Sequence, residues 1–248
     1  MDTAMDTITQ EFLRDRQQRL LDRAGERPYM YLSLTPAKIS GPDNVIDVAD
    51  PAVVDLLRNP PNFRQGGWGI YRTEPRPTPD GFLGEFDVTA LRDTQRLELL
   101  RNGHLELSVK IDDKRFDIEY VSRNGQDIPT LSVYPLCEIS LNFLRLGSAI
   151  FCGERYRTGG VLVTGMGLYN IHGYSLCACG RNTEGYKRQF SENNFPLWEE
   201  EHLILRPVEV PPALEPGPLA KKLAGELWSA FDFRKPPALF DEQGRFRP

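Results

Sequence analysis

The chain has little of the chemistry that marks secreted, membrane or nucleic-acid-binding proteins. Four cysteines in 248 residues are too few for a disulfide framework, so we expect free thiols in a reducing compartment. No apolar run approaches the roughly 20 residues that span a bilayer, and no secretory signal is recognisable. The formal net charge of -5 gives no general attraction to phosphate backbones. These absences predict a cytoplasmic protein without a membrane partner or a direct nucleic-acid partner.

The common catalytic and nucleotide-binding motifs are also missing. The sequence contains no Gly-x-x-x-x-Gly-Lys phosphate loop, no Gly-x-Ser-x-Gly elbow and no His-Glu-x-x-His zinc motif. Glycine-rich stretches such as GGVLVTG lack the strand-to-helix context of a dinucleotide site. The sequence therefore predicts no catalytic residue, no metal ligand and no cofactor.

The apolar pattern that is present predicts an α+β fold. Strand-forming runs with Asn-Gly, proline and glycine turns alternate with segments whose apolar residues have helical spacing. These helical segments lie within residues 9–24, 51–57, 137–156 and 219–231. We expect a mainly antiparallel sheet of about seven strands, built from hairpins and packed by two or three helices. The resulting division is an N-terminal helix (1–27), one α+β domain (28–233) and an irregular tail (234–248).

One hairpin carries a specific prediction of register. Residues 97–109 read LELLRNGHLELSV, two apolar-alternating runs that meet at Asn102 and Gly103. A two-residue loop would divide the leucines between both faces of the sheet. A three-residue loop with a left-handed Gly103 instead pairs Leu99 with Leu105 and Leu97 with Leu107, and we favour it. The opposite face is then polar, and we expect it to be solvated. It carries Glu98, His104, Glu106 and Lys110.

Several other features favour ordinary structural roles. Charges of both signs in the first helix are typical of a solvated face. They are Arg14, Arg16, Arg19 and Arg23, with Asp15 and Asp22. GWGIYR is best explained as a strand with Trp68 in the core, Pro129 predicts an edge strand or an irregular return, and His202 suits a surface position.

The candidate ligand-binding residues are Arg155, Arg157, His172 and Tyr174. The loop ERYRTGG, which contains both arginines, can face an anionic ligand, although a polar loop joining a helix to a strand explains it equally well. His172 lies in a glycine-rich region, where a core or turn histidine bonded to backbone is the alternative. An enzyme would require these arginines and His172 to converge in one pocket.

The stretch HGYSLCACG contains residue types that can bind a metal ion. His172, Cys177 and Cys179 are close in sequence, and two cysteines two residues apart on a strand share one face. A second pair of ligands with matching spacing is missing. We therefore favour buried free thiols over a zinc site.

The order of the motifs resembles a known family. The segment RDRQQRLLDRAGERPYMYLSLTP is followed by GGWGIYR, PDGFLGEF, LELLRNGHLEL, GLYNIHGY and LAGELWSAFDF. This order is similar to the region after the Schlafen/AlbA-like domain in bacterial proteins described as divergent ATP-binding or DNA-binding proteins. It spans nearly the whole chain, but nothing before Pro28 is long enough to be the Schlafen/AlbA-like domain itself. The resemblance implies a C-terminal module and transfers no catalytic residue.

These observations predict a non-enzymatic binding or interaction module that acts as an accessory or sensor. The resemblance implies a role in bacterial defence or regulation, with a protein partner such as a Schlafen/AlbA-like or other effector protein. The alternatives are an enzyme acting on nucleotides or nucleic acid, and a direct nucleic-acid binder, which the acidic balance disfavours.

Overall fold

The computed structural model describes most of the chain. The described residues are 5–40, 46–47, 50–88, 91–111, 116, 118–152, 161–177, 195–210, 213–232 and 239–247. The helices of this part are α1 (Thr7–Ala24), α2 (Pro51–Arg58), α3 (Val133–Phe151) and α5 (Pro216–Ala230). The strands are β1 (Tyr29–Pro36), β2 (Arg76–Thr78), β3 (Gly81–Val88), β4 (Leu91–Leu100), β5 (Leu105–Lys110), β6 (Glu119–Arg123), β7 (Gln126–Ser132), β8 (Leu162–Tyr169), β9 (Ser175–Cys177), β10 (His202–Ile204) and β11 (Val208–Val210). No helix among these residues is long and apolar enough to cross a membrane.

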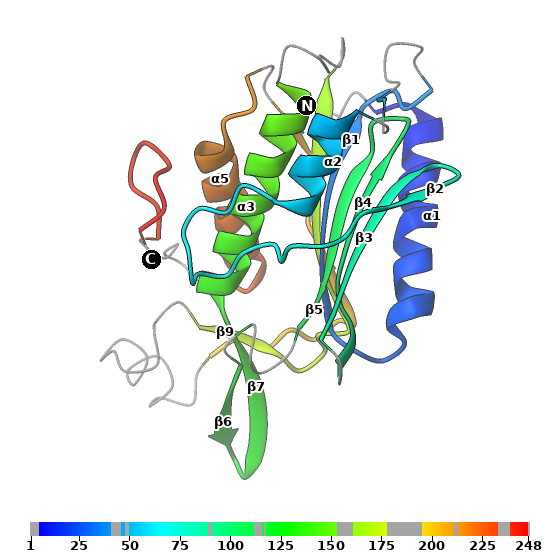
Figure 1. Ribbon diagram of the computed structural model, residues 1–248. Coiled ribbons are helices and arrows are strands. Elements are labelled where there is room, and N and C mark those ends of the chain that lie inside the picture. Colours follow the sequence, from blue (N-terminus) through cyan, green and yellow to red (C-terminus); the bar gives the residue numbers. More distant parts are fainter. Residues whose placement is uncertain are drawn as a thin grey trace.

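The fold is α+β, as the sequence predicts. Eight strands form the main antiparallel sheet in the order β10-β8-β1-β5-β4-β3-β2, with β11 also paired to β8. A smaller sheet has the order β6-β7-β9. Figure 1 shows α1 alone on one face of the main sheet and α2, α3 and α5 on the other, while the β6–β7 hairpin extends away from the body.

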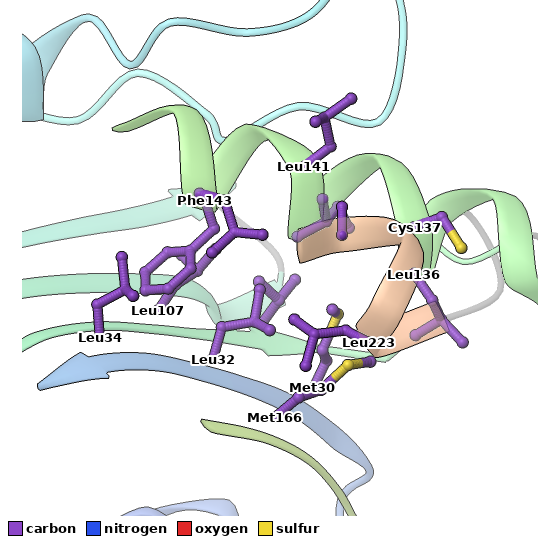
Figure 2. Close-up of a cluster of buried hydrophobic side chains, with 14 of the residues drawn as sticks. Met30, Leu32, Leu34, Leu107, Leu136, Cys137, Leu141, Phe143, Met166 and Leu223 are labelled. Atoms are coloured by element: carbon purple, nitrogen blue, oxygen red, sulfur yellow. The ribbon is translucent and has the colours of Figure 1, made fainter. Parts of the chain in front are cut away.

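The core lies between the main sheet and α3. Every residue of β1 is buried, because the strand is central and helices cover both of its faces. Its alternate residues Met30, Leu32 and Leu34 belong to the large apolar cluster, and Figure 2 shows them beneath α3 with Phe143 above the strands. Burying such a side chain contributes about 1.5–3 kcal/mol relative to leaving it exposed. These contacts fix α3 and the sheet as the rigid frame.

The predicted register of the β4–β5 hairpin is confirmed. Leu97 pairs with Leu107 and Leu99 with Leu105, and Gly103 has a φ of 82°. The Leu100 amide donates to the His104 carbonyl at 2.8 Å, which closes the three-residue loop. Glycine suits this position because an L side chain rarely adopts a positive φ.

Two local expectations were wrong in detail. Residues 66–73 contain no strand, although Trp68 does pack against the core. Pro129 lies in the middle strand β7, opposite Tyr120 of β6, while the pairing of β7 with β9 begins only at Thr130. The missing amide of Pro129 therefore breaks no bond to β9.

The remaining boundaries agree broadly with the expected elements. Asp50 caps α2, accepting a hydrogen bond from the Ala52 amide, and proline occupies the first helical turn. The segment 201–210 forms two short strands, β10 and β11. In the tail, Phe240 and Phe246 form an isolated bridge, and Phe246 packs edge-on against Phe63.

Candidate ligand-binding cleft and the ion cluster beneath it

Helix α1 is attached to the sheet through a buried ion cluster. Arg16 is only 8% exposed, and its guanidinium bonds to Glu98 on β4 and Glu106 on β5. Its Nε donates to Glu106 Oε2 at 3.0 Å. The expectation of a solvated helix face is wrong for Arg16, because this part of the face packs against the sheet.

The register of β4 and β5 explains why a cation is needed here. Glu98 lies directly opposite Glu106, and both carboxylates are buried. Like charges in such a cross-strand pair repel each other, and a buried charge without a partner is costly. Arg16 bridges the two glutamates and neutralises one of their charges.

Glu106 is the central acceptor of the cluster. Besides Arg16, it accepts hydrogen bonds from the Tyr31 hydroxyl at 3.1 Å and from His104 Nε2 at 3.0 Å. Burial by itself would raise the pKa of Glu106, but the bonds from His104 and Arg16 outweigh it and hold the pKa well below the usual range. Glu106 is thus a carboxylate across the neutral pH range.

His104 is fully buried, so the expectation of a solvated histidine is wrong. Its Nδ1 lies 2.8 Å from Thr35 Oγ1, and the Phe12 ring of α1 packs edge-on against the imidazole with centroids 5.0 Å apart. The chain Thr35–His104–Glu106 has the hydroxyl, imidazole and carboxylate of a nucleophilic triad. Phe12 and Arg16 cover it, so the geometry suits support of α1 and gives a substrate no access.

The cluster continues across the sheet toward solvent. Arg96 Nη2 bonds to Glu98 at 3.3 Å, and its Nη1 bonds to Glu85 at 2.8 Å. Arg76 on β2 bonds to the other oxygen of Glu85 at 2.8 Å. Charges therefore alternate from Arg16 beneath the helix to the sheet edge, and each described carboxylate of the series has a cationic neighbour.

Beside the ion cluster, α1 and two sheet turns enclose a cleft of about 310 Å³. The α1 wall consists of Phe12, Asp15, Arg16 and Arg19, and the opposite wall of Pro79, Asp80, Leu100, Arg101 and Asn102. A hydrogen bond from the Arg101 amide to the Asp80 carbonyl at 2.8 Å joins the two turns. This bond fixes the turn wall, and the ion cluster fixes the α1 wall.

Both walls of the cleft carry both signs of charge. On α1, Arg19 Nη2 pairs with Asp15 at 2.9 Å, and both side chains are more than half exposed. On the turn wall, the side chains of Arg101 and Asp80 have no hydrogen-bond or ion-pair partner within the described part of the chain. We name these four residues, Asp15, Arg19, Asp80 and Arg101, the charged rim.

The ligand residues proposed from sequence lie elsewhere or outside the described part. Arg155 and Arg157 fall outside the described residues, as does Cys179. His172 is exposed in the turn between β8 and β9, and its Nδ1 lies 2.8 Å from the Glu199 carbonyl. Tyr174 packs against the large core, and its carbonyl accepts from the Trp198 amide. Neither His172 nor Tyr174 lines the cleft.

None of the cysteines within the described part forms a disulfide. Cys137 and Cys177 are buried, and Cys152 is exposed. Burial raises the pKa of the Cys137 thiol to about 12, which keeps it protonated and unreactive at neutral pH. No group of three His, Cys, Asp or Glu residues in the described ranges is arranged to hold a metal ion.

Sequence reasoning missed the ion cluster beside the cleft, yet one signal for the cluster was present. The predicted hairpin register already placed Glu98 opposite Glu106 on one face. Two opposed glutamates next to a histidine require a cation from another element. The arginine-rich first helix was the nearest source, and Arg16 occupies that position.

Comparison with known proteins does not supply a function. No family model, curated protein or solved structure matches this chain. The geometry of the cleft is therefore the basis for a functional assignment.

Proposed function

We propose that this chain is a non-enzymatic binding module whose cleft between α1 and the sheet turns holds a small zwitterionic ligand, such as a free amino acid or the end of a short peptide. The observation that carries this proposal is the charged rim, which presents an arginine and an aspartate on each wall. The volume of about 310 Å³ is at the small end of the range for ligand sites.

The rim matches the two charges of a zwitterion. A carboxylate between the walls can accept hydrogen bonds from Arg19 and Arg101, and guanidinium groups suit this contact because their donors form a fork. An ammonium group can then bind Asp80 or Asp15. The same aspartates repel additional negative charge, which disfavours polyphosphates and nucleic-acid strands. Phe12 offers an apolar surface for the remainder of the ligand.

A binding role also agrees with the position of the potentially reactive groups. Thr35 and His104 have no exposed surface, and Glu106 is 4% exposed. Their hydrogen bonds are made to one another and to Arg16 and Tyr31. We infer that these groups position α1, and thereby the cleft wall, without contacting the ligand.

The wider context of this proposal comes from the motif order. Its similarity to the region after the Schlafen/AlbA-like domain supports an accessory or sensor module in bacterial defence or regulation. In that setting, the cleft would detect the ligand and the protein partner would be an effector. The choice of partner rests on the resemblance alone.

Calorimetric titration tests the ligand class. The panel is the standard amino acids, dipeptides, inorganic phosphate, ATP and a single-stranded DNA oligonucleotide. We expect binding by at least one amino acid or dipeptide, and weaker or no binding by ATP and DNA. A preference for ATP or DNA, or the absence of any binding in the panel, would refute the zwitterion proposal.

A matched pair of variants tests the position of the site. Arg101→Gln removes a cation of the rim, and a charge-assisted hydrogen bond is worth about 1.5–3 kcal/mol, so affinity should fall about 10- to 100-fold. Arg72→Gln removes an exposed arginine that does not line the cleft and should leave affinity unchanged. Equal effects of the two substitutions would place the ligand elsewhere.

A further inference from the structure

The most buried polar side chain in the lining of the cleft is that of Arg16. The side chains of the charged rim are exposed. Arg16 is only 8% exposed, and Leu100, on the opposite wall, is 5% exposed. The cleft is therefore layered, with the charged rim at its solvent end and a buried floor below. We use the word floor for Arg16 and Leu100.

The Arg16 guanidinium has N–H groups that no described residue accepts. Arginine carries five N–H donors, one on Nε and two on each terminal nitrogen. Nε donates to Glu106 at 3.0 Å, and Nη2 bonds to both Glu98 and Glu106. Nη1 has no hydrogen-bond or ion-pair partner in the described part of the chain, yet it is not sealed from solvent. Because Arg16 lines the cleft, Nη1 offers its two N–H groups to a ligand there.

The charges around Nη1 favour a neutral acceptor over an anion. Ion pairs join three arginines and three glutamates into one series: Arg16, Arg76, Arg96, Glu85, Glu98 and Glu106. The positive charge of Arg16 is thus already balanced. A carboxylate at Nη1 would be repelled by the two glutamates that Arg16 binds, whereas a carbonyl oxygen can accept the same hydrogen bonds without adding a charge.

An acceptor also belongs to this lining. Asn102 lines the cleft and is partly buried. Its Oδ1 accepts one hydrogen bond within the described ranges, from the His104 amide at 3.1 Å. A carbonyl-type oxygen has two lone pairs, so Oδ1 can accept a second bond. The cleft therefore offers a donor and an acceptor, the combination that matches the oxygen and the NH₂ of a primary amide.

We propose that the ligand is a free amino acid whose side chain ends in an amide, as in asparagine or glutamine, and that Arg16 Nη1 binds the amide oxygen. This inference rests on the proposed function, in which the rim binds the ammonium and carboxylate groups. These two groups of an amino acid are bonded to one carbon, so holding both at the rim leaves the side chain to enter the cleft. It passes Phe12 and Leu100, and an apolar side chain there would leave Nη1 without an acceptor.

Calorimetric titration with two series of similar shape tests the choice of side chain. The first series is asparagine, aspartate and leucine, and the second is glutamine, glutamate and methionine. In at least one series the amide should bind about 10-fold or more tighter than the apolar member, and tighter than the carboxylate.

The outcomes separate this inference from the zwitterion proposal. Equal affinity for the amide and the apolar member in both series would overturn the inference and leave the zwitterion proposal standing, as would tighter binding of the carboxylate. Tighter binding of dialanine, which has no side-chain amide, would also overturn it. Failure of every amino acid and dipeptide to bind would refute the zwitterion proposal itself.

A matched pair of variants tests the part played by Arg16. Arg16→Lys keeps a cation between Glu98 and Glu106 but has no Nη1, so the preference for the amide over the apolar member should fall to about 2-fold or less. Arg19→Lys alters the rim one turn away and should leave this ratio unchanged. A displaced α1 would weaken both ligands alike, so the ratio reports the contact. An unchanged ratio in Arg16→Lys would overturn the assignment to Nη1.

Nitrogen-15 NMR spectroscopy of the guanidinium groups gives a test on the unmodified chain. The Arg16 signals are identified by their loss in Arg16→Lys. The Nη1 signal should shift on addition of the preferred amide ligand and should not shift on addition of leucine or methionine. Arg16 signals that do not respond to a bound amide ligand would overturn the inference.

Discussion

Replacing Arg16 by methionine should destabilise the protein far more than an ordinary change on a helix surface. The substitution leaves Glu98 and Glu106 facing each other across β4 and β5 without their shared cation. Removing one partner of a buried ion pair typically costs about 3–5 kcal/mol. Glu106 retains His104, and Glu98 retains Arg96, so we expect a loss near the lower limit, about 3 kcal/mol in the free energy of unfolding.

Urea denaturation measures this loss, and Arg19→Met is the matched control. With a urea m-value of about 3 kcal/mol/M, Arg16→Met should lower the midpoint by about 1 M at pH 7. Arg19 lies one turn away on α1, and its pair with Asp15 is solvent-exposed, so its substitution should cost about 0–1 kcal/mol. Equal midpoints for the two variants would refute the idea that the ion cluster holds α1 on the sheet.

The destabilisation caused by Arg16→Met should be larger at neutral pH than in acid. The folded pKa of Glu106 is lowered by His104 and Arg16 together, so ionised Glu106 stabilises the folded state above the unfolded pKa of about 4.3. This contribution disappears as pH falls through the lower folded pKa. Without Arg16, the pKa of Glu106 rises, so acidification removes less of the free energy of unfolding. The difference in the free energy of unfolding between the unmodified chain and Arg16→Met should therefore be greatest near neutral pH and become smaller below about pH 4.

Two glycines give predictions of opposite sign, both measurable as changes in Tm. At Gly67 a Cβ would overlap Glu138 Oε1, so Gly67→Ala should disturb the ion pair between buried Glu138 and Arg64. The expected cost is about 1–3 kcal/mol in the free energy of unfolding, and an unchanged Tm would contradict it. At Gly225, within α5, a Cβ would meet nothing within 4 Å, so Gly225→Ala should stabilise the protein by about 0.5–1 kcal/mol, and a lower Tm would contradict that.

The local sequence pattern was sufficient to predict how two neighbouring strands pair. The leucines of residues 97–107 determine the β4–β5 register, because a shift by one residue would move them all to the other face. The same pattern could not establish what covers the opposite face. The prediction that His104 and Glu106 face solvent followed from the rule that the polar face of a sheet is usually solvated. The helix that covers them comes from about 90 residues earlier in the chain, as the separation between Arg16 and Glu106 records.

The interpretation of α1 was wrong for the same reason. An alternating series of arginines and aspartates has the composition of an exposed helix whether or not one arginine is buried. Arg16 lies on the side of α1 that packs against the sheet, whereas the side chain of Arg19 is exposed to solvent. The cleft combines one helix face with two distant turns, so no continuous motif records it. The sequence candidates His172 and Tyr174 belong to one short motif, and the structure places them away from this cleft.

Substitutions in the ion cluster and in the cleft test different things. Arg16 both lines the cleft and holds α1 on the sheet. A loss of binding in Arg16→Met could come from a displaced α1 as well as from a lost ligand contact. Arg101→Gln is therefore the substitution that tests the ligand contact by itself.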